Sequence, residues 1–152
     1  MSHRHSLLVL AGLLVASAVS VTADDVRVKV ALLDGVPVYH WRAFKSRFPD
    51  DVDRALVIRE FKRRAFTVPD RFVEKALQKK ITKSFHDDKA AFEDRLKRSG
   101  ASIAEYKRFL SEELILAVFP QLAKSAAGAD SPTERAKWIA SLRKSAKITL
   151  LR

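Results

Sequence analysis

A chain of 152 residues with a formal net charge of +11 is long enough for one domain with its own hydrophobic core. The positive charge favours anionic surfaces or acidic polypeptides as partners. Because the chain contains no cysteine, disulfides and thiol chemistry are excluded, and packing must stabilise the fold.

Residues 1–23 have the three parts of an export signal. Arg4 supplies a weakly basic start, residues 7–21 form an apolar run, and residues 21–23 (Val-Thr-Ala) form a small-residue cleavage site. A retained membrane anchor is the alternative, but a bilayer crossing needs about 20 apolar residues and this run is shorter. We therefore expect cleavage after Ala23, an exported mature chain, and no stable membrane span afterwards.

The mature chain begins with a predicted β-hairpin over residues 26–39, because two apolar runs flank an Asp34-Gly35 turn. A short helix is expected next, over residues 40–48, with Pro49 ending it. A two-stranded hairpin alone is marginally stable in water, so we expect a third strand to complete the sheet.

The centre of the chain predicts several helices, because its apolar residues recur at helical intervals. Acidic or capping residues mark their starts, at Asp50-Asp51, Val68-Pro69-Asp70, Asp87-Asp88 and Ser102 with Glu105. Pro120 is expected to kink or end the last of them. Residues 124–130, rich in Ala, Ser and Gly, are interpreted as the main flexible linker.

The closing segment, residues 131–151, predicts one more helix and a strand. Ser131 and Glu134 have capping-box spacing around Pro132, and residues 147–151 (Lys-Ile-Thr-Leu-Leu) follow the helix that carries Trp138 and offer a short strand. The predicted fold is thus mainly α, a helical bundle-like domain with a small antiparallel β-sheet. The N-terminal hairpin and the C-terminal strand form that sheet.

Four strings of residues, in this order, resemble a known family. They are residues 30–38, 55–73, 92–116 and 138–151, and together they cover most of residues 26–151. Their order is similar to the N-terminal, peptide-binding domain of the SurA-type periplasmic chaperones, with its closing helix and strand. The resemblance implies that residues 24–152 form one SurA N-terminal-like domain, located in the periplasm.

The chain departs from that family in one respect. Family members usually carry parvulin-type prolyl isomerase domains before the closing segment, where this chain has only the linker expected at 124–130. His40 and His86 are the only histidines after the export signal, and they lack the spacing of a zinc site or an activated nucleophile. We therefore expect no enzyme, no catalytic residue, no metal and no cofactor.

The basic clusters of the chain do not predict a nucleic-acid interface. They lie at residues 59–64, 79–83 and 97–98, on several predicted helices and without a recognition motif. A solvated surface is the simpler interpretation. The same charge would speed encounter with acidic clients, and anionic envelope surfaces are a further candidate partner.

The aromatic residues are too numerous for one helix face, so most are expected in the core. Five lie at predicted helix ends or off the main apolar stripes, and are our candidates for an exposed peptide-binding surface: Tyr39, Trp41, Phe48, Phe66 and Phe109. The alternative is that these residues too are buried packing residues.

These observations lead to the expectation of an ATP-independent, chaperone-like domain that binds unfolded or extended envelope polypeptides. The binding cleft is expected between the helical body and the closing segment, with backbone groups available to pair with an extended client. The alternatives are a non-catalytic subunit that binds one specific envelope partner, a basic binder of anionic lipid surfaces, and a prolyl isomerase.

Overall fold

The computed structural model describes residues 26–151, so the predicted export signal at 1–23 lies outside the described residues. In chain order the elements are β1 (Arg27–Leu33), β2 (Val36–Trp41), α2 (Asp51–Arg63), α3 (Asp70–Phe85), α4 (Lys89–Arg98), α5 (Ile103–Ala117), α6 (Phe119–Ala127), α7 (Pro132–Lys144) and β3 (Ile148–Leu150). The fold is mainly α with a small antiparallel sheet, which confirms the predicted fold class.

The sheet joins the two ends of the described chain. Its strand order is β2-β1-β3, and β1 pairs antiparallel with both neighbours. Leu33 lies opposite Val36 across the hairpin and opposite Ile148 on the other side. Asp34 and Gly35 turn the hairpin with φ values of 50° and 82°, the left-handed conformation that such tight turns require. The predicted hairpin and the predicted third strand are both confirmed.

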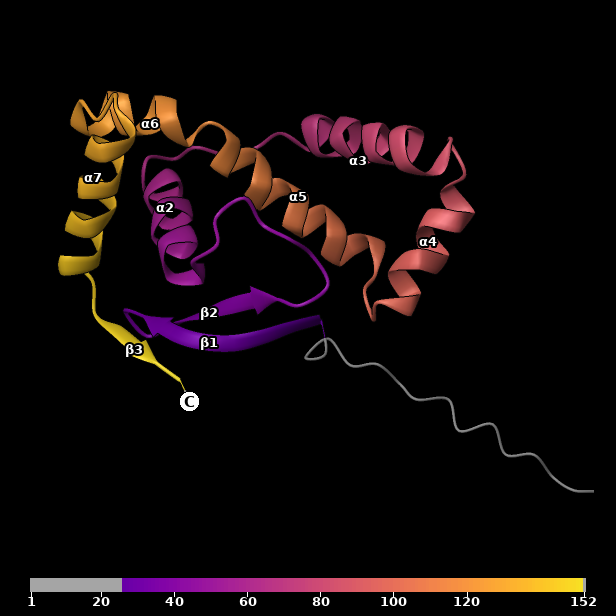
Figure 1. Ribbon diagram of the computed structural model, residues 1–152, viewed down its shortest axis with the longest axis horizontal. Coiled ribbons are helices and arrows are strands. Elements are labelled where there is room, and N and C mark those ends of the chain that lie inside the picture. The colour runs from indigo at the N-terminus through magenta and orange to yellow at the C-terminus, as the bar shows by residue number, and fades with distance from the viewer. Residues whose placement is uncertain (1–25, 152) are drawn as a thin grey trace, which may run out of the picture.

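Figure 1 shows the sheet along one side of the molecule, with α5 running across the helical layer above it. Helices α3 and α4 form an arm at one end, where α3 packs on α5. Helices α6 and α7 lie at the other end, and α7 packs against α2 before the chain returns to the sheet as β3. Helix α5 therefore connects the two ends of the helical layer.

The core has three parts along this length. One lies between the sheet and α2 and contains Ala31, Leu33, Val38, Val52 and Leu56. A second joins α2 to α5 and α6 through Val57, Ile58, Phe61, Ile115, Leu116, Phe119, Ala123 and Ala129, and the partly buried Trp138 and Ile139 of α7 pack against it. The third fills the α3–α4 arm with Val26, Trp41, Leu77, Ile81, Phe92, Leu96, Ala101, Tyr106 and Phe109.

The helix starts follow the signals in the sequence. Ser102 with Glu105 and Ser131 with Glu134 both form complete capping boxes, in which each side chain satisfies a backbone N–H of the other. Pro120 lies in the first turn of α6, so the chain ends α5 just before it and starts a new helix.

The predicted helix over residues 40–48 is wrong. His40 and Trp41 belong to β2, and the chain from 42 to 50 has neither helix nor strand. Glu113 of α5 accepts hydrogen bonds from the backbone N–H of Arg47 at 3.1 Å and from the Ser46 hydroxyl. The buried carboxylate of a helix far along the chain thus accepts a hydrogen bond from a backbone N–H of this segment.

The predicted flexible linker is also shorter than expected. Lys124 and the three residues after it continue α6, and Gly128 ends that helix in the left-handed conformation with φ 63°. Alanine has the highest helix propensity, which explains why this Ala-rich stretch is helical. Ala129 is 3% exposed, so the short connection that remains is packed against the core.

Candidate functional site

A hollow with a largely apolar lining lies between β2 and helices α2 and α5, with a volume of about 280 Å³. We call it the β2–α2 pocket. Its lining residues are Arg27, Leu33, Val36, Pro37, Val38, Tyr39, Trp41, Arg54, Ala55, Ile58, Arg59, Lys62, Arg108 and Glu112. The pocket thus combines apolar side chains from the sheet and α2 with basic side chains from three elements, β1, α2 and α5.

The wall of the β2–α2 pocket is formed by core residues that reach the surface there. Leu33, Val38 and Ile58 are between 4% and 8% exposed, so the protein itself holds them in place. Val36, by contrast, is 65% exposed at the hairpin end of the same pocket. An apolar side chain from another molecule would cover Val36 and remove apolar surface from water.

A buried arginine forms part of the pocket wall. Arg54 is 5% exposed, and its Nη1 donates to the Glu112 carboxylate, while its Nη2 donates to the backbone carbonyl of Tyr39 at 3.0 Å. The Trp41 indole N–H also donates to Glu112, at 3.1 Å. These bonds connect β2, α2 and α5, because β2 contributes Tyr39 and Trp41, α2 contributes Arg54 and α5 contributes Glu112. The pocket is therefore held rigidly on the side of α5.

Further basic side chains surround the opening of the pocket. Arg59 pairs with the carboxylate of Asp34, and the Arg27 guanidinium lies 4.3 Å from the centre of the Tyr39 ring. Lys62 and Arg108 are exposed and form no ion pair with any residue of 26–151. The opening is therefore electropositive.

The five predicted peptide-binding residues do not form one surface. Tyr39 and Trp41 line the β2–α2 pocket, and Trp41 also borders a second hollow that is lined by Phe48. Phe66 lies elsewhere, 42% exposed, with its ring 5.1 Å from that of Phe61. The structure thus brings Tyr39, Trp41 and Phe48 near each other and leaves Phe66 apart.

The expected exposure of Trp41 and Phe109 is wrong. Trp41 is 4% exposed and Phe109 is 6% exposed, and their ring centres lie 6.0 Å apart in an edge-to-face arrangement. Both belong to the core of the α3–α4 arm, together with Tyr106, whose burial raises the pKa of its phenol. Non-local packing decides this burial, because the aromatic rings come from three separate segments.

The expected cleft between the helical body and the closing segment is not apolar. The hollow between α2 and α7 is lined by Arg59, Glu60, Arg63 and Arg64, together with Asp34, Trp138, Leu142 and Ser145. A hydrogen bond from Arg63 holds the pKa of the Glu60 carboxyl below its usual value, with Arg64 acting in the same direction. This charged hollow is therefore a poor site for apolar side chains.

The edge strand β2 is a limited template for strand addition. Its described neighbour is β1 alone. Pro37 has no backbone N–H, and the carbonyl of Tyr39 already accepts from Arg54. These two features oppose the expectation that an extended client pairs fully with the backbone of β2.

The key polar residues of the pocket were missed in the sequence, although one signal was present. Arg54 occupies a position on α2 one turn before Val57 and Ile58, on the buried face of the helix. A charge on a buried helix face requires a partner, and Glu112 is that partner. The identity of the partner was not readable, because Glu112 lies 58 positions away.

Within residues 26–151, no group of three His, Asp or Glu side chains is arranged to hold a metal ion. His40 is exposed, and its Nδ1 lies 2.9 Å from a carboxylate oxygen of Asp51. In the same part of the chain, no helix is long and apolar enough to cross a bilayer.

Comparison with known proteins adds no relative. No protein-family model matches the chain, and no curated protein matches it.

Proposed function

We propose that this protein is a non-catalytic, chaperone-like domain that binds unfolded or extended polypeptides without ATP. The observation that carries the proposal is the β2–α2 pocket, whose apolar wall is held by the core and whose hairpin end leaves Val36 exposed. A pocket of about 280 Å³ accommodates one or two side chains of a client segment. A contact with only one or two client side chains is weak and reversible, as chaperone action requires.

The rigid support of the β2–α2 pocket by the sheet and by α5 favours the proposal. A client site needs a rigid scaffold, since apolar surface that collapses on itself is lost to the client. The pocket meets this condition because β1 is held between β2 and β3, while Arg54 and Glu112 connect the pocket walls. The order of the elements is also the order that the resemblance to SurA-type chaperones implies, and we place the proposed function in an exported compartment on that basis.

The test is a measurement of light scattering while an unfolded outer-membrane protein is diluted out of denaturant, with and without the mature chain. The mature chain is expected to suppress aggregation. Ala55 is half-buried in the pocket wall, so Ala55→Phe fills the pocket and is expected to weaken suppression. Ala136→Phe, on an exposed position of α7, is the matched control and should act like the unchanged protein.

Cross-linking gives an independent readout. A photoactivatable residue at Val36 should capture client peptides, whereas the same residue at Ala136 should not. Equal capture at both positions, or no suppression of aggregation by the unchanged protein, would contradict the proposal.

A further inference from the structure

We infer that the β2–α2 pocket selects client segments in which an apolar side chain has a carboxylate beside it. The inference rests on the proposed function and names the chemical class of its preferred clients. The inference is based on the numbers of basic and acidic side chains around the opening of the pocket. The pocket is lined by five basic side chains, Arg27, Arg54, Arg59, Lys62 and Arg108, and by one carboxylate, that of Glu112.

The single carboxylate of the lining is already committed. Glu112 accepts from the Arg54 guanidinium and from the Trp41 indole N–H through the same oxygen. Arg108 lies one helical turn before Glu112 on α5 but makes no ion pair with it. Glu112 therefore neutralises Arg54 and leaves Arg108 uncompensated.

The other cations divide into paired and unpaired groups. Arg59 is paired with Asp34 of the hairpin turn. Arg27, Lys62 and Arg108 have no carboxylate partner within residues 26–151. They come from β1, α2 and α5, so three separate elements place an uncompensated positive charge around one opening.

A carboxylate entering this opening would meet donors that are already in place. The Arg27 side chain is held over the Tyr39 ring, at 4.3 Å, and is therefore less free than an arginine on an open surface. Glu112 balances the charge of Arg54, which is 5% exposed, but the buried Nε of Arg54 has no hydrogen-bond partner within the described residues. The uncompensated cations beside an apolar wall of low dielectric attract an anion and oppose the entry of another cation.

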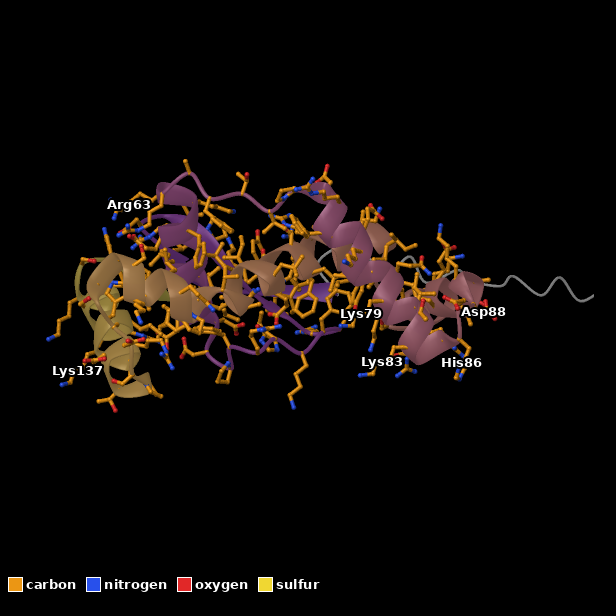
Figure 2. All side chains as sticks on the ribbon, turned by 90° about the horizontal axis from the view of Figure 1, so that it is seen from above. Arg63, Lys79, Lys83, His86, Asp88 and Lys137 are labelled. Atoms are coloured by element: carbon orange, nitrogen blue, oxygen red, sulfur yellow. The ribbon has the colours of Figure 1, made fainter. Side chains whose placement is uncertain are left out.

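The apolar part of the pocket sets the second requirement. A carboxylate alone would be bound equally well by the exposed lysines of α3, such as Lys79 and Lys83, which Figure 2 shows on the arm at one end of the molecule. Those lysines line none of the pockets described above. The combination of an apolar wall with uncompensated cations distinguishes the β2–α2 pocket from the other basic surfaces.

The experiment uses three fluorescent peptides that differ at one position beside a central leucine, where they carry Glu, Gln or Lys. Binding of each peptide to the full mature chain is measured by fluorescence anisotropy at low salt and at 0.5 M salt, with about tenfold tighter binding expected for the Glu peptide than for the Gln peptide at low salt. The Lys peptide should bind most weakly. Raising the salt should reduce the preference for Glu.

Two double variants separate the pocket from the overall charge. Lys62→Gln with Arg108→Gln removes two of the three uncompensated cations of the opening, and this variant should lose most of the preference for the Glu peptide over the Gln peptide. Lys79→Gln with Lys83→Gln removes the same charge from α3 and should keep the preference for Glu. All four positions are exposed, so the folds are expected to persist, which circular dichroism checks.

Three results would overturn the inference. Equal binding of all three peptides by the unchanged protein would refute charge selection while leaving the proposed function in place. An equal loss of the Glu preference in both double variants would show that net charge, not the pocket, is responsible. If none of the peptides binds and aggregation is not suppressed, the proposed function fails together with the inference.

Discussion

Asp34, in the hairpin turn, holds Lys147, which lies 113 positions further along the chain, by two hydrogen bonds. The Asp34 carboxylate accepts from the backbone N–H of Lys147 at 2.7 Å, and the Asp34 N–H donates to the Lys147 carbonyl at 2.8 Å. The same carboxylate pairs with Arg59 of α2. One turn residue thus connects the hairpin, the first long helix and the closing strand.

Replacing this residue should loosen the closing strand. Asp34→Ala removes both side-chain contacts and leaves at φ 50° a residue that has no side-chain oxygen for a local hydrogen bond, so we expect a loss of about 2 kcal/mol in the free energy of unfolding. Asp34→Asn is the control, because asparagine tolerates this conformation and keeps one acceptor oxygen, and it should cost about half as much. Urea unfolding measures both, and a loss in Asp34→Ala no larger than in Asp34→Asn would contradict the assigned role.

Removing Glu112 should be more damaging. Glu112→Ala leaves the guanidinium of Arg54 without its carboxylate at 5% exposure, and breaking such a buried pair costs about 3 kcal/mol or more. The matched control is Glu93→Ala, which removes an exposed pair with Lys89 at 3.7 Å and should cost about 0.5 kcal/mol or less. Thermal and urea unfolding of the two variants would be compared, and similar losses in both would show that the Arg54–Glu112 pair is not a structural connection.

The hydrogen bond that Arg63 donates to Glu60 predicts a dependence of stability on pH. Because this bond lowers the pKa of Glu60 in the folded state, Glu60 contributes stability that is fully present above its ordinary pKa of 4.5 and is lost as the pH falls through the folded-state pKa. Glu60→Gln has no such titration. The difference in unfolding free energy between the two proteins should therefore be largest at neutral pH and should shrink as the solution is acidified below 4.5.

The check is a series of urea unfolding curves for both proteins from neutral pH to about two units below the ordinary carboxyl pKa. A difference that stays constant across this range would mean that Glu60 is not stabilised in its charged form by the fold. The Arg63→Gln variant tests the named cause, since it should reduce the pH dependence that is attributed to Glu60.

Local signals predicted much of the fold. The Asp34-Gly35 turn was recognisable because few residue pairs adopt positive φ twice in succession. The two capping boxes were recognisable because both partners lie within one helical turn. The return of the C-terminal strand was predicted from a different consideration, the instability of a lone hairpin.

The errors lie where distant residues act on a segment. The helix predicted over residues 40–48 does not form, because Glu113 of α5 accepts from the Ser46 hydroxyl and the Arg47 backbone and Trp41 enters the core. Contacts between distant residues also explain the errors in the predicted peptide-binding surface. Of the five aromatic residues, Phe109 is enclosed by rings from other segments, which no local pattern reveals.

The sequence by itself therefore determined where helices and turns begin, since capping hydrogen bonds and φ preferences act within a few residues. Only the tertiary structure decided that Arg27, Arg54 and Arg108 lie around one apolar pocket, because they come from β1, α2 and α5 and meet through packing of the sheet against the helices. The physical reason is the separation along the chain of the residues that interact. Backbone preferences are local, whereas the position of a charge beside an apolar wall depends on contacts between residues far apart in the chain.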